Sequence, residues 1–264
     1  MKVLIKLGGT LLDAAESRLR LASEICSAVS QGLACVVVHG GGKQMTRYLA
    51  SHGVESRFVN GLRVTTPDVL DAVIKVLAGS VNRELVSSFI ACGANAVGLS
   101  GMDALLTEAK RMSEELGWVG QPVRSNGRLL NVLLDSGYLP VIACLAGDRQ
   151  GQFFNVNADQ MAVSVASALA ADRLLFLTDV DGVRGENNVV HSTLNPDQCR
   201  KLIETGIATG GMRAKLESAT EAMQAGISEV IIAAGTTPGV IGKLLAGDLI
   251  GTRLVATSTV YRNA

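Results

Sequence analysis

Consecutive glycines at the ends of two apolar runs are the feature that most restricts how this chain can fold. Residues 3–7 are followed by Gly8-Gly9, residues 35–38 lead into Gly40-Gly41-Gly42, and residues 16–29 between them have a helical pattern. A strand, a helix and a second strand in this order form a parallel pair with a right-handed crossover. Ligands of such sheets bind outside the carboxyl ends of the strands. The sequence therefore predicts a ligand site at the two glycine turns.

Strands and helices continue to alternate along the rest of the 264 residues. This alternation is typical of the α/β class, with helices on both faces of a mainly parallel sheet, which is a three-layer αβα sandwich. The length is compatible with one large domain. We expect a single domain over residues 1–264. A soft division near residue 172 would separate two halves, 1–172 and 173–264, that share one continuous sheet.

Local signals predict a hairpin and several helix starts. The Asn60-Gly61 pair between alternating apolar residues is a strong hairpin signal, and Thr66 before a proline predicts the start of a helix. We expect Ser125 to cap the helix that follows it. The helix that begins at residue 67 is apolar on two sides. Such a helix lies either in a subunit interface or in the core of one subunit, and the sequence leaves both readings open.

Charge and cysteine content narrow the class of partner. The 24 Lys and Arg residues balance 24 Asp and Glu residues, so no net charge attracts nucleic acid or an anionic membrane. Five scattered cysteines without a Cys-x-x-Cys pair are typical of reduced thiols in the cytoplasm. Lys6 and Gly8-Gly9 interrupt any signal-peptide segment, and the charge-free residues 85–102 hold too many serines and glycines for a membrane span. We expect a cytoplasmic protein with small-molecule substrates.

Several common catalytic motifs are missing from the sequence. There is no Gly-x-Gly-x-x-Gly fingerprint, and Gly42-Lys43 lacks the flanking residues of a Walker A loop. The three histidines have no metal-ligand spacing, and no Gly-x-Ser-x-Gly elbow is present. Dinucleotide binding, P-loop hydrolysis, zinc catalysis and serine hydrolysis are therefore disfavoured, and no protein ligands for a metal are predicted.

Three features point to an anionic ligand. The backbone N–H groups of Gly8-Gly9 and Gly40-Gly41-Gly42 can converge on a polyphosphate, although glycines can also simply turn a strand into a helix. A buried ammonium such as that of Lys6, in an apolar strand, is costly unless it meets an anion; the alternative is that it reaches the surface at the end of the sheet. Asn157 can cap the next helix, which leaves Asn155 free to face a ligand.

Six motifs in order along nearly the whole chain resemble the amino-acid kinase family. They are Lys6-Leu7-Gly8-Gly9, His39-Gly40-Gly41-Gly42, Asn60-Gly61-Leu62-Arg63-Val64-Thr65, Asn155-Val156-Asn157-Ala158-Asp159-Gln160, Thr178-Asp179-Val180-Asp181-Gly182 and Gly211-Met212-Arg213-Ala214-Lys215. The third and fourth motifs resemble most the members that phosphorylate the side-chain carboxylate of N-acetyl-L-glutamate in arginine biosynthesis.

The resemblance implies three groups of site residues. Lys6 and Lys215 would stabilise the transition state of phosphoryl transfer, and Asp159 would hold both ammonium groups in place. The acceptor would be bound by Gly41, Gly42, Arg63 and Asn155. ATP, with Mg²⁺ bridging its phosphates, would be bound by Gly8, Gly9, Asp179, Val180, Asp181, Gly182, Val183, Arg184, Ile207, Ala208 and Thr209. The half 1–172 would take the amino-acid substrate and the half 173–264 would take ATP.

Phosphoryl transfer to a carboxylate explains why no catalytic base is evident. A carboxyl group with a pKa of about 4.3 is already ionised at neutral pH, so no proton has to be removed. The task that remains is to position two anions and neutralise their charge.

Two departures from the family pattern leave the acceptor open. Residues 143–146 lack the expected Ser/Pro-rich stretch, and Phe58-Val59 replaces basic residues found in some relatives. The acceptor could therefore carry another acyl group, as in succinylglutamate or carrier-linked aminoadipate. A sensor without catalytic activity is a further alternative, disfavoured because Lys6 and Lys215 are both present. Since no N-terminal helix precedes the first strand, we expect a homodimer, paired through residues 67–79 and insensitive to arginine.

Overall fold

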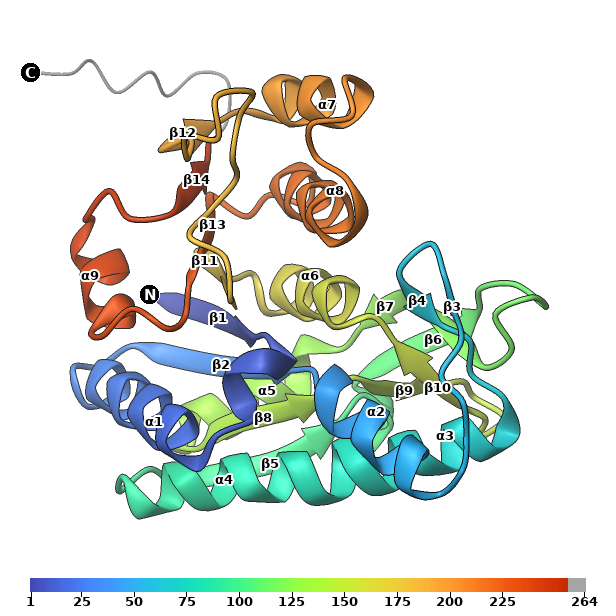
Figure 1. The fold of residues 1–264 in the computed structure, drawn as a ribbon. Coiled ribbons are helices and arrows are strands. Elements are labelled where there is room, and N and C mark those ends of the chain that lie inside the picture. The colour runs from blue at the N-terminus through green and yellow to red at the C-terminus, as the bar shows by residue number, and fades with distance from the viewer. Residues whose placement is uncertain (256–264) are drawn as a thin grey trace, which may run out of the picture.

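The computed structural model describes residues 1–255 and contains one large central sheet (Figure 1). Its strands are β1 (Lys2–Leu7), β2 (Ala34–His39), β5 (Ala96–Ser100), β8 (Leu139–Ala143), β11 (Arg173–Thr178), β12 (Thr193–Leu194), β13 (Glu229–Ala234) and β14 (Thr252–Leu254). Their order across the sheet is β12-β14-β13-β11-β1-β2-β8-β5. All neighbours are parallel except β13 and β14. The predicted mainly parallel sheet is confirmed.

Helices cover both faces of this sheet, as Figure 1 shows. One face carries α1 (Ala15–Ser30), α4 (Asn82–Ala91) and α9 (Val240–Ala246), and the other carries α5 (Gly127–Asp135), α6 (Ala158–Leu169), α7 (Pro196–Glu204) and α8 (Gly210–Gln224). Alternate side chains of each central strand enter one of two apolar cores, so that Ile5 packs under α1 whereas Leu4 packs under α6. The three-layer α/β class is confirmed.

The two halves of the chain meet inside the sheet. β1 and β11 pair in parallel from Val3 and Arg173 to Leu7 and Leu177. The strands from before residue 172 lie on one side of this seam, and the strands from after it lie on the other. Strands of both halves therefore belong to the same eight-stranded sheet.

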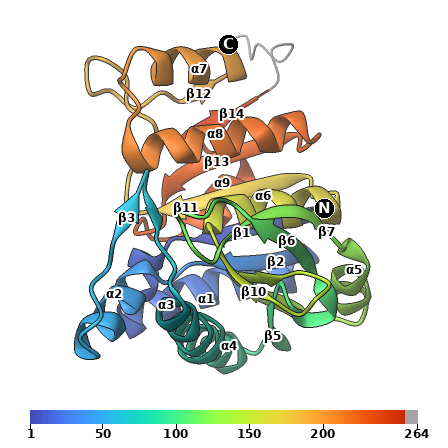
Figure 2. The same cartoon turned by 90° about the vertical axis from the view of Figure 1, so that its right-hand side faces the viewer.

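Smaller elements surround the carboxyl ends of the strands. The predicted hairpin forms β3 (Phe58–Val59) and β4 (Leu62–Arg63), with Asn60 and Gly61 at positive φ. Figures 1 and 2 show it rising toward the C-terminal half of the molecule. A small closed barrel contains β6 (Thr107–Arg111), β7 (Val119–Ser125), β9 (Leu145–Gly147) and β10 (Phe153–Val156). The short helices η1 (Gly9–Leu12) and η3 (Asp103–Leu105) and helix α2 (Gly42–Ser51) complete this region.

The helix expected from residue 67 contains a wide turn. It comprises α3 (Pro67–Val73), a π-helical segment η2 (Ile74–Val81) and α4. Thr66 caps its start, as predicted, by accepting a hydrogen bond from the N–H of Val69 at 3.4 Å. The second apolar face, with Val69, Ala72 and Val76, is buried within this chain. Of the two readings left open, burial in the core of one subunit is therefore observed for this face.

One predicted helix cap is wrong. Asn126, and not Ser125, caps α5 by accepting a hydrogen bond from the N–H of Arg128 at 3.0 Å. Ser125 is still the last residue of β7, and its hydroxyl makes hydrogen bonds with those of Thr107 and Ser164, both at 2.8 Å. Within residues 1–255, no helix is long and apolar enough to cross a membrane.

Candidate active site

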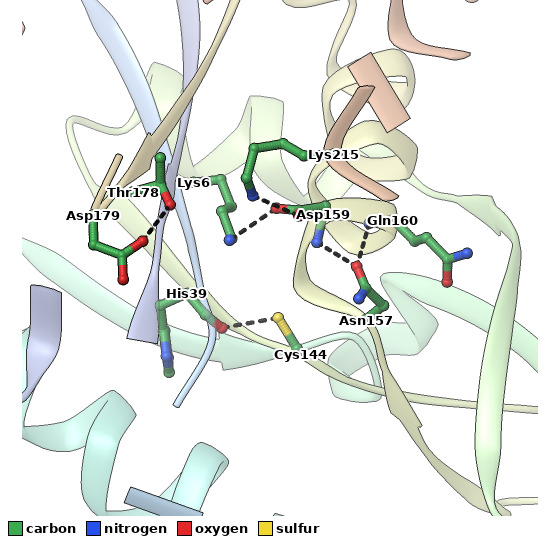
Figure 3. Close-up of polar contacts among 9 residues, drawn as sticks. All are labelled: Lys6, His39, Cys144, Asn157, Asp159, Gln160, Thr178, Asp179 and Lys215. Atoms are coloured by element: carbon green, nitrogen blue, oxygen red, sulfur yellow. Dashed lines mark hydrogen bonds and ion pairs between the residues drawn. The ribbon is translucent and has the colours of Figure 1, made fainter. Parts of the chain in front are cut away.

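Three charged residues from distant parts of the chain meet at one carboxylate (Figure 3). Lys6 lies near the end of β1, Asp159 in the first turn of α6, and Lys215 in α8. Nζ of Lys6 is 2.8 Å from Oδ1 of Asp159, and Nζ of Lys215 donates a hydrogen bond of 2.8 Å to Oδ2. All three side chains are buried. The structure thus brings together the three residues predicted to be catalytic.

The start of α6 fixes the carboxylate between the two lysines. Oδ1 of Asn157 accepts hydrogen bonds from the N–H groups of Asp159 at 2.8 Å and Gln160 at 3.2 Å, so Asn157 is the helix cap that the sequence predicts. Asp159 in the first turn also interacts favourably with the helix dipole. Its side chain is therefore held where both ammonium groups can reach it.

Electrostatics keep this cluster charged. Burial on its own raises the pKa of Asp159, but the ammonium groups of Lys6 and Lys215 outweigh that effect and lower the pKa to about 2. Burial and the charge of Lys6 lower the pKa of Lys215, against the attraction of Asp159. Two ammonium groups share one carboxylate, so the cluster has a net charge of +1. A buried net positive charge is suited to an anionic ligand.

The two glycine turns face each other next to this cluster. A Cβ added to Gly9 would lie 2.8 Å from the nitrogen of Gly42 and 3.1 Å from that of Gly41. Among the described residues, no backbone carbonyl accepts the N–H of Gly41 or Gly42. A cavity of about 580 Å³ opens here and is lined by Lys6, Gly8, Gly9, Thr10, Gly42, Lys43, Thr46, Arg47, Phe58, Arg63, Thr178 and Asp179. Free N–H groups beside ammonium groups can bind a phosphate.

The predicted acceptor residues line a second, smaller cavity. Gly41, Gly42, Arg63 and Asn155 surround about 180 Å³ of space, together with apolar side chains that include Met45, Leu62, Val73 and Leu77. Gly42 and Arg63 line both cavities, which therefore adjoin. The structure brings these four predicted residues together.

Neighbouring hydroxyl groups hold Arg63 in place. Its guanidinium donates hydrogen bonds to Oγ1 of Thr46 at 2.8 Å, to the carbonyl of Gly42 at 3.2 Å and to Oγ of Ser56. It also lies over the ring of Phe58, 4.6 Å from the ring centroid. Burial lowers the pKa of Arg63, which nevertheless stays a cation at neutral pH because arginine loses its proton only at very high pH.

Thr65 connects Arg63 to Asn155. Its buried hydroxyl donates to the carbonyl of Arg63 at 2.9 Å and accepts from Nδ2 of Asn155 at 3.0 Å. The second bond orients the Asn155 amide. Thr46 and Thr65 were missed as site residues by sequence reasoning. Thr65 lies inside the Asn60–Thr65 motif, which is a usable signal, whereas Thr46 is an ordinary helical residue with none.

The residues predicted to bind ATP are only partly gathered. Gly8, Gly9 and Asp179 line the larger cavity, and the other predicted residues do not line it. The side chain of Val183 is fully buried, and the N–H of Val183 donates to Oγ1 of Thr252 at 2.8 Å. Residues 207–209 lead directly into α8, the helix that carries Lys215.

The carboxylate of Asp179 is an oxygen ligand suited to magnesium. It lines the larger cavity, and Oγ1 of Thr178 donates to its Oδ1 at 3.1 Å. Mg²⁺ is usually held by one or two carboxylates together with substrate phosphates. Within residues 1–255, no group of three His, Cys, Asp or Glu side chains is arranged to hold a metal ion. The donor set fits a magnesium that arrives with ATP.

Comparisons with known proteins identify the family. The sequence pattern of the Amino acid kinase family matches residues 1–234. Acetylglutamate kinase from Solibacter usitatus is 58% identical over 255 residues, which is 97% of this chain and 99% of that protein. The structure of smu.665 from Streptococcus mutans has a TM-score of 0.84 at 29% identity, covering 97% of this chain and 98% of that one. N-acetylglutamate synthase from Neisseria gonorrhoeae, complexed with coenzyme A and N-acetyl-glutamate, has a TM-score of 0.87 at 25% identity, covering 98% of this chain and 60% of that one. With most of its length matched by the family pattern and nearly all of it by a close relative, this chain belongs to the amino acid kinase family.

Proposed function

We propose that this chain transfers the γ-phosphoryl group of ATP to the side-chain carboxylate of N-acetyl-L-glutamate, a step of arginine biosynthesis. The observation that carries the proposal is the cluster in which Lys6 and Lys215 share Asp159 beside two facing glycine turns. Relatives that cover nearly the whole chain and carry the name acetylglutamate kinase support the substrate.

The reaction needs charge neutralisation more than proton transfer. A carboxylate oxygen of the acceptor forms a bond to the γ-phosphorus, the bond from that phosphorus to the bridging oxygen breaks, and ADP leaves with the electron pair. The acceptor is already ionised, so no base acts. Lys6 would neutralise the transferring group and Lys215 the leaving ADP, with Asp159 holding both ammonium groups. Magnesium, when bound with ATP, supplies further positive charge to its phosphates.

The smaller cavity supports a small, uncharged acyl group. Arg63 would bind the α-carboxylate of the acceptor in a two-pronged contact, and Asn155 would hydrogen-bond the acylated nitrogen. The remaining wall is formed largely by apolar side chains such as Met45, Leu62 and Val73. A succinyl group would bring a second carboxylate against this wall, where its burial without a cation is unfavourable. The acetyl group avoids that cost.

The two halves of the chain would bind different substrates. We assign the acceptor to residues 1–172 and ATP to residues 173–264 together with Gly8 and Gly9. The protein would act in the cytoplasm as a homodimer. Within residues 67–79, the apolar side chains of Ile74 and Ala78 are only partly buried and could take part in pairing. A sizing column that gives the mass of one chain would refute the dimer.

Release of ADP tests the proposal. Purified protein is incubated with magnesium, ATP and, in parallel, N-acetyl-L-glutamate, N-succinyl-L-glutamate or an N-acylated aminoadipate. We expect the highest kcat/KM with N-acetyl-L-glutamate. Lys6→Ala should reduce kcat by about 100- to 1,000-fold, the effect of removing one group that stabilises a transition-state anion. Arg200→Ala, at an exposed pair with Asp197, is the control and should have little effect. No ADP release with any acceptor would favour the sensor alternative, and faster turnover with the succinyl compound would overturn the choice of acyl group.

A further inference from the structure

The proposed reaction assigns no role to the buried histidine beside the glycine turn. His39 is the last residue of β2, directly before the glycine turn, and its side chain is fully buried. Its Nδ1 is 2.9 Å from the carbonyl oxygen of Gly40, and its Nε2 is 3.0 Å from Nδ2 of Asn82. The ring therefore connects the glycine turn to the first residue of α4.

The partners of His39 define its tautomer. The Gly40 carbonyl can only accept, so Nδ1 must carry the proton. Nδ2 of Asn82 can only donate, and it also donates to the carbonyl of Val141 at 3.0 Å, so Nε2 of His39 must be the acceptor. The orientation of the Asn82 amide is consistent, because its Oδ1 accepts from Arg83. The ring is thus neutral with the proton on Nδ1. Burial lowers the pKa of His39 to about 4, in agreement with a neutral ring.

This tautomer has a consequence for the next peptide group. In a planar trans peptide, the carbonyl of one residue and the N–H of the following residue point in opposite directions. The Gly40 carbonyl points to the His39 ring, so the N–H of Gly41 points away from it. That N–H has no backbone acceptor among the described residues, and Gly9 lies beside it. His39 thereby orients one of the N–H groups of the glycine turn that can bind a phosphate.

The wide helical turn supports the same peptide from behind. A Cβ added to Gly41 would meet side-chain atoms of Leu77 at 2.5 Å and Val81 at 3.4 Å, both in η2. Asn82 follows directly and reaches His39. π-helical turns are frequent at functional sites. Here the turn ends with Leu77 and Val81 against the glycine turn and Asn82 against the histidine that orients it.

We propose that His39, itself held by Asn82, is a positioning residue that turns the Gly40–Gly41 peptide so that the Gly41 N–H faces the transferring phosphoryl group. The identity of the anion in this inference rests on the proposed function. The tautomer of His39 and the orientation of the Gly40–Gly41 peptide follow from the hydrogen bonds alone.

Variants at His39 distinguish a role in orienting the peptide from a role in packing alone. Leucine at this position removes both hydrogen bonds, whereas asparagine keeps a donor, its Nδ2, close to the place of the imidazole Nδ1. We expect His39→Leu to lower kcat by about 100-fold, the scale of a misplaced catalytic group. His39→Asn should keep most of the wild-type kcat. Asn82→Leu should fall between the two. His52→Leu is the control, at an exposed histidine whose Nδ1 lies 2.9 Å from the carbonyl oxygen of Tyr48 in α2.

The affinities for ADP and for a mimic of the transition state should respond differently if His39 positions the peptide, but not if its role is only structural. The Kd of ADP alone should be unchanged in His39→Leu. The Kd of ADP with aluminium fluoride and N-acetyl-L-glutamate, which together mimic the transferring group, should rise in proportion to the loss of kcat. Equal losses of affinity for both, or an unchanged kcat, would overturn the proposal.

A measurement on the unmodified protein covers the case in which the leucine variant does not fold. ¹⁵N chemical shifts of the His39 ring distinguish the two neutral tautomers. We expect protonated Nδ1 and unprotonated Nε2; the opposite tautomer would refute the positioning role even in an active enzyme. An inactive wild-type protein with the expected tautomer would instead refute the proposed function and leave the peptide orientation intact.

Discussion

Replacing Asp159 with asparagine tests the charge arrangement on which the site depends. The side chain keeps its size but loses the negative charge that two buried ammonium groups share. Each Nζ–Oδ distance is 2.8 Å, so at an effective dielectric constant of about 20 each pair has roughly 6 kcal/mol of Coulomb attraction before solvation is considered. The attraction is partly offset by the cost of taking the charges out of water. Removal of one partner from a buried pair typically costs about 3–5 kcal/mol.

The expected result is a large loss of stability that an anionic ligand reverses. For a chain of this size, a loss of about 3–5 kcal/mol lowers Tm by roughly 6–20 °C. The two unpaired ammonium groups should bind the phosphates of ADP or ATP strongly, so saturating nucleotide should recover much of the loss of Tm in Asp159→Asn. Turnover should still fall by about 100-fold or more, because the lysines are no longer held in place.

Differential scanning calorimetry with and without nucleotide measures both effects. Asp197→Asn is the matched control, because Asp197 pairs with Arg200 at an exposed position of α7. Exposed pairs of this kind contribute about 0–1 kcal/mol. If Asp159→Asn unfolds within 2 °C of wild type, roughly the effect of 1 kcal/mol or less, the cluster does not hold two charged lysines and the reasoning is refuted.

Three further outcomes are expected. Burial and the charge of Lys6 lower the pKa of Lys215, and the ammonium form of Lys215 is the active one. In a pH–rate profile, kcat/KM should therefore fall as pH rises, with an alkaline midpoint below the usual lysine value of 10.5. A midpoint above that value would contradict this expectation. The pKa of His39 is lowered to about 4, so the unfolded chain takes up a proton below about pH 6.5 that the folded protein does not, and the free energy of unfolding should decrease by about 2–3 kcal/mol between about pH 7.5 and 4.5. Urea titrations of wild type and His39→Asn isolate this contribution, which should be absent from the variant. Thr65→Val keeps the shape of the residue but leaves the Asn155 amide without its hydrogen-bond acceptor. The variant should raise KM for the acyl-amino acid by about 10-fold, with little change in KM for ATP. Equal changes in both KM values would argue against a role of Thr65 in acceptor binding.

The parts of the fold that depend on neighbouring residues could be predicted from the sequence. The glycine turns after β1 and β2, the Asn60-Gly61 hairpin and the Thr66 cap each follow from a few adjacent residues. The Ser125 prediction was wrong because two adjacent residues, Ser125 and Asn126, can both cap a helix. The choice depends on the extension of β7, which points Ser125 toward Thr107 and Ser164.

The parts of the site that depend on distant contacts needed more than local reasoning. Lys215 taken alone is an ordinary helical lysine, and only the family resemblance placed it with Asp159, 56 residues earlier. The contact between His39 and Asn82 spans 43 residues and carries no local signal. The same holds for the burial of Val69, Ala72 and Val76, since an apolar helix face does not reveal whether its partner belongs to the same chain.

The seam between β1 and β11 limits how the molecule can deform. Five consecutive residue pairs from Val3–Arg173 to Leu7–Leu177 hold the two halves edge to edge, so they cannot swing about a flexible joint. A rotation of one half against the other would have to twist these neighbouring strands against their shared hydrogen bonds.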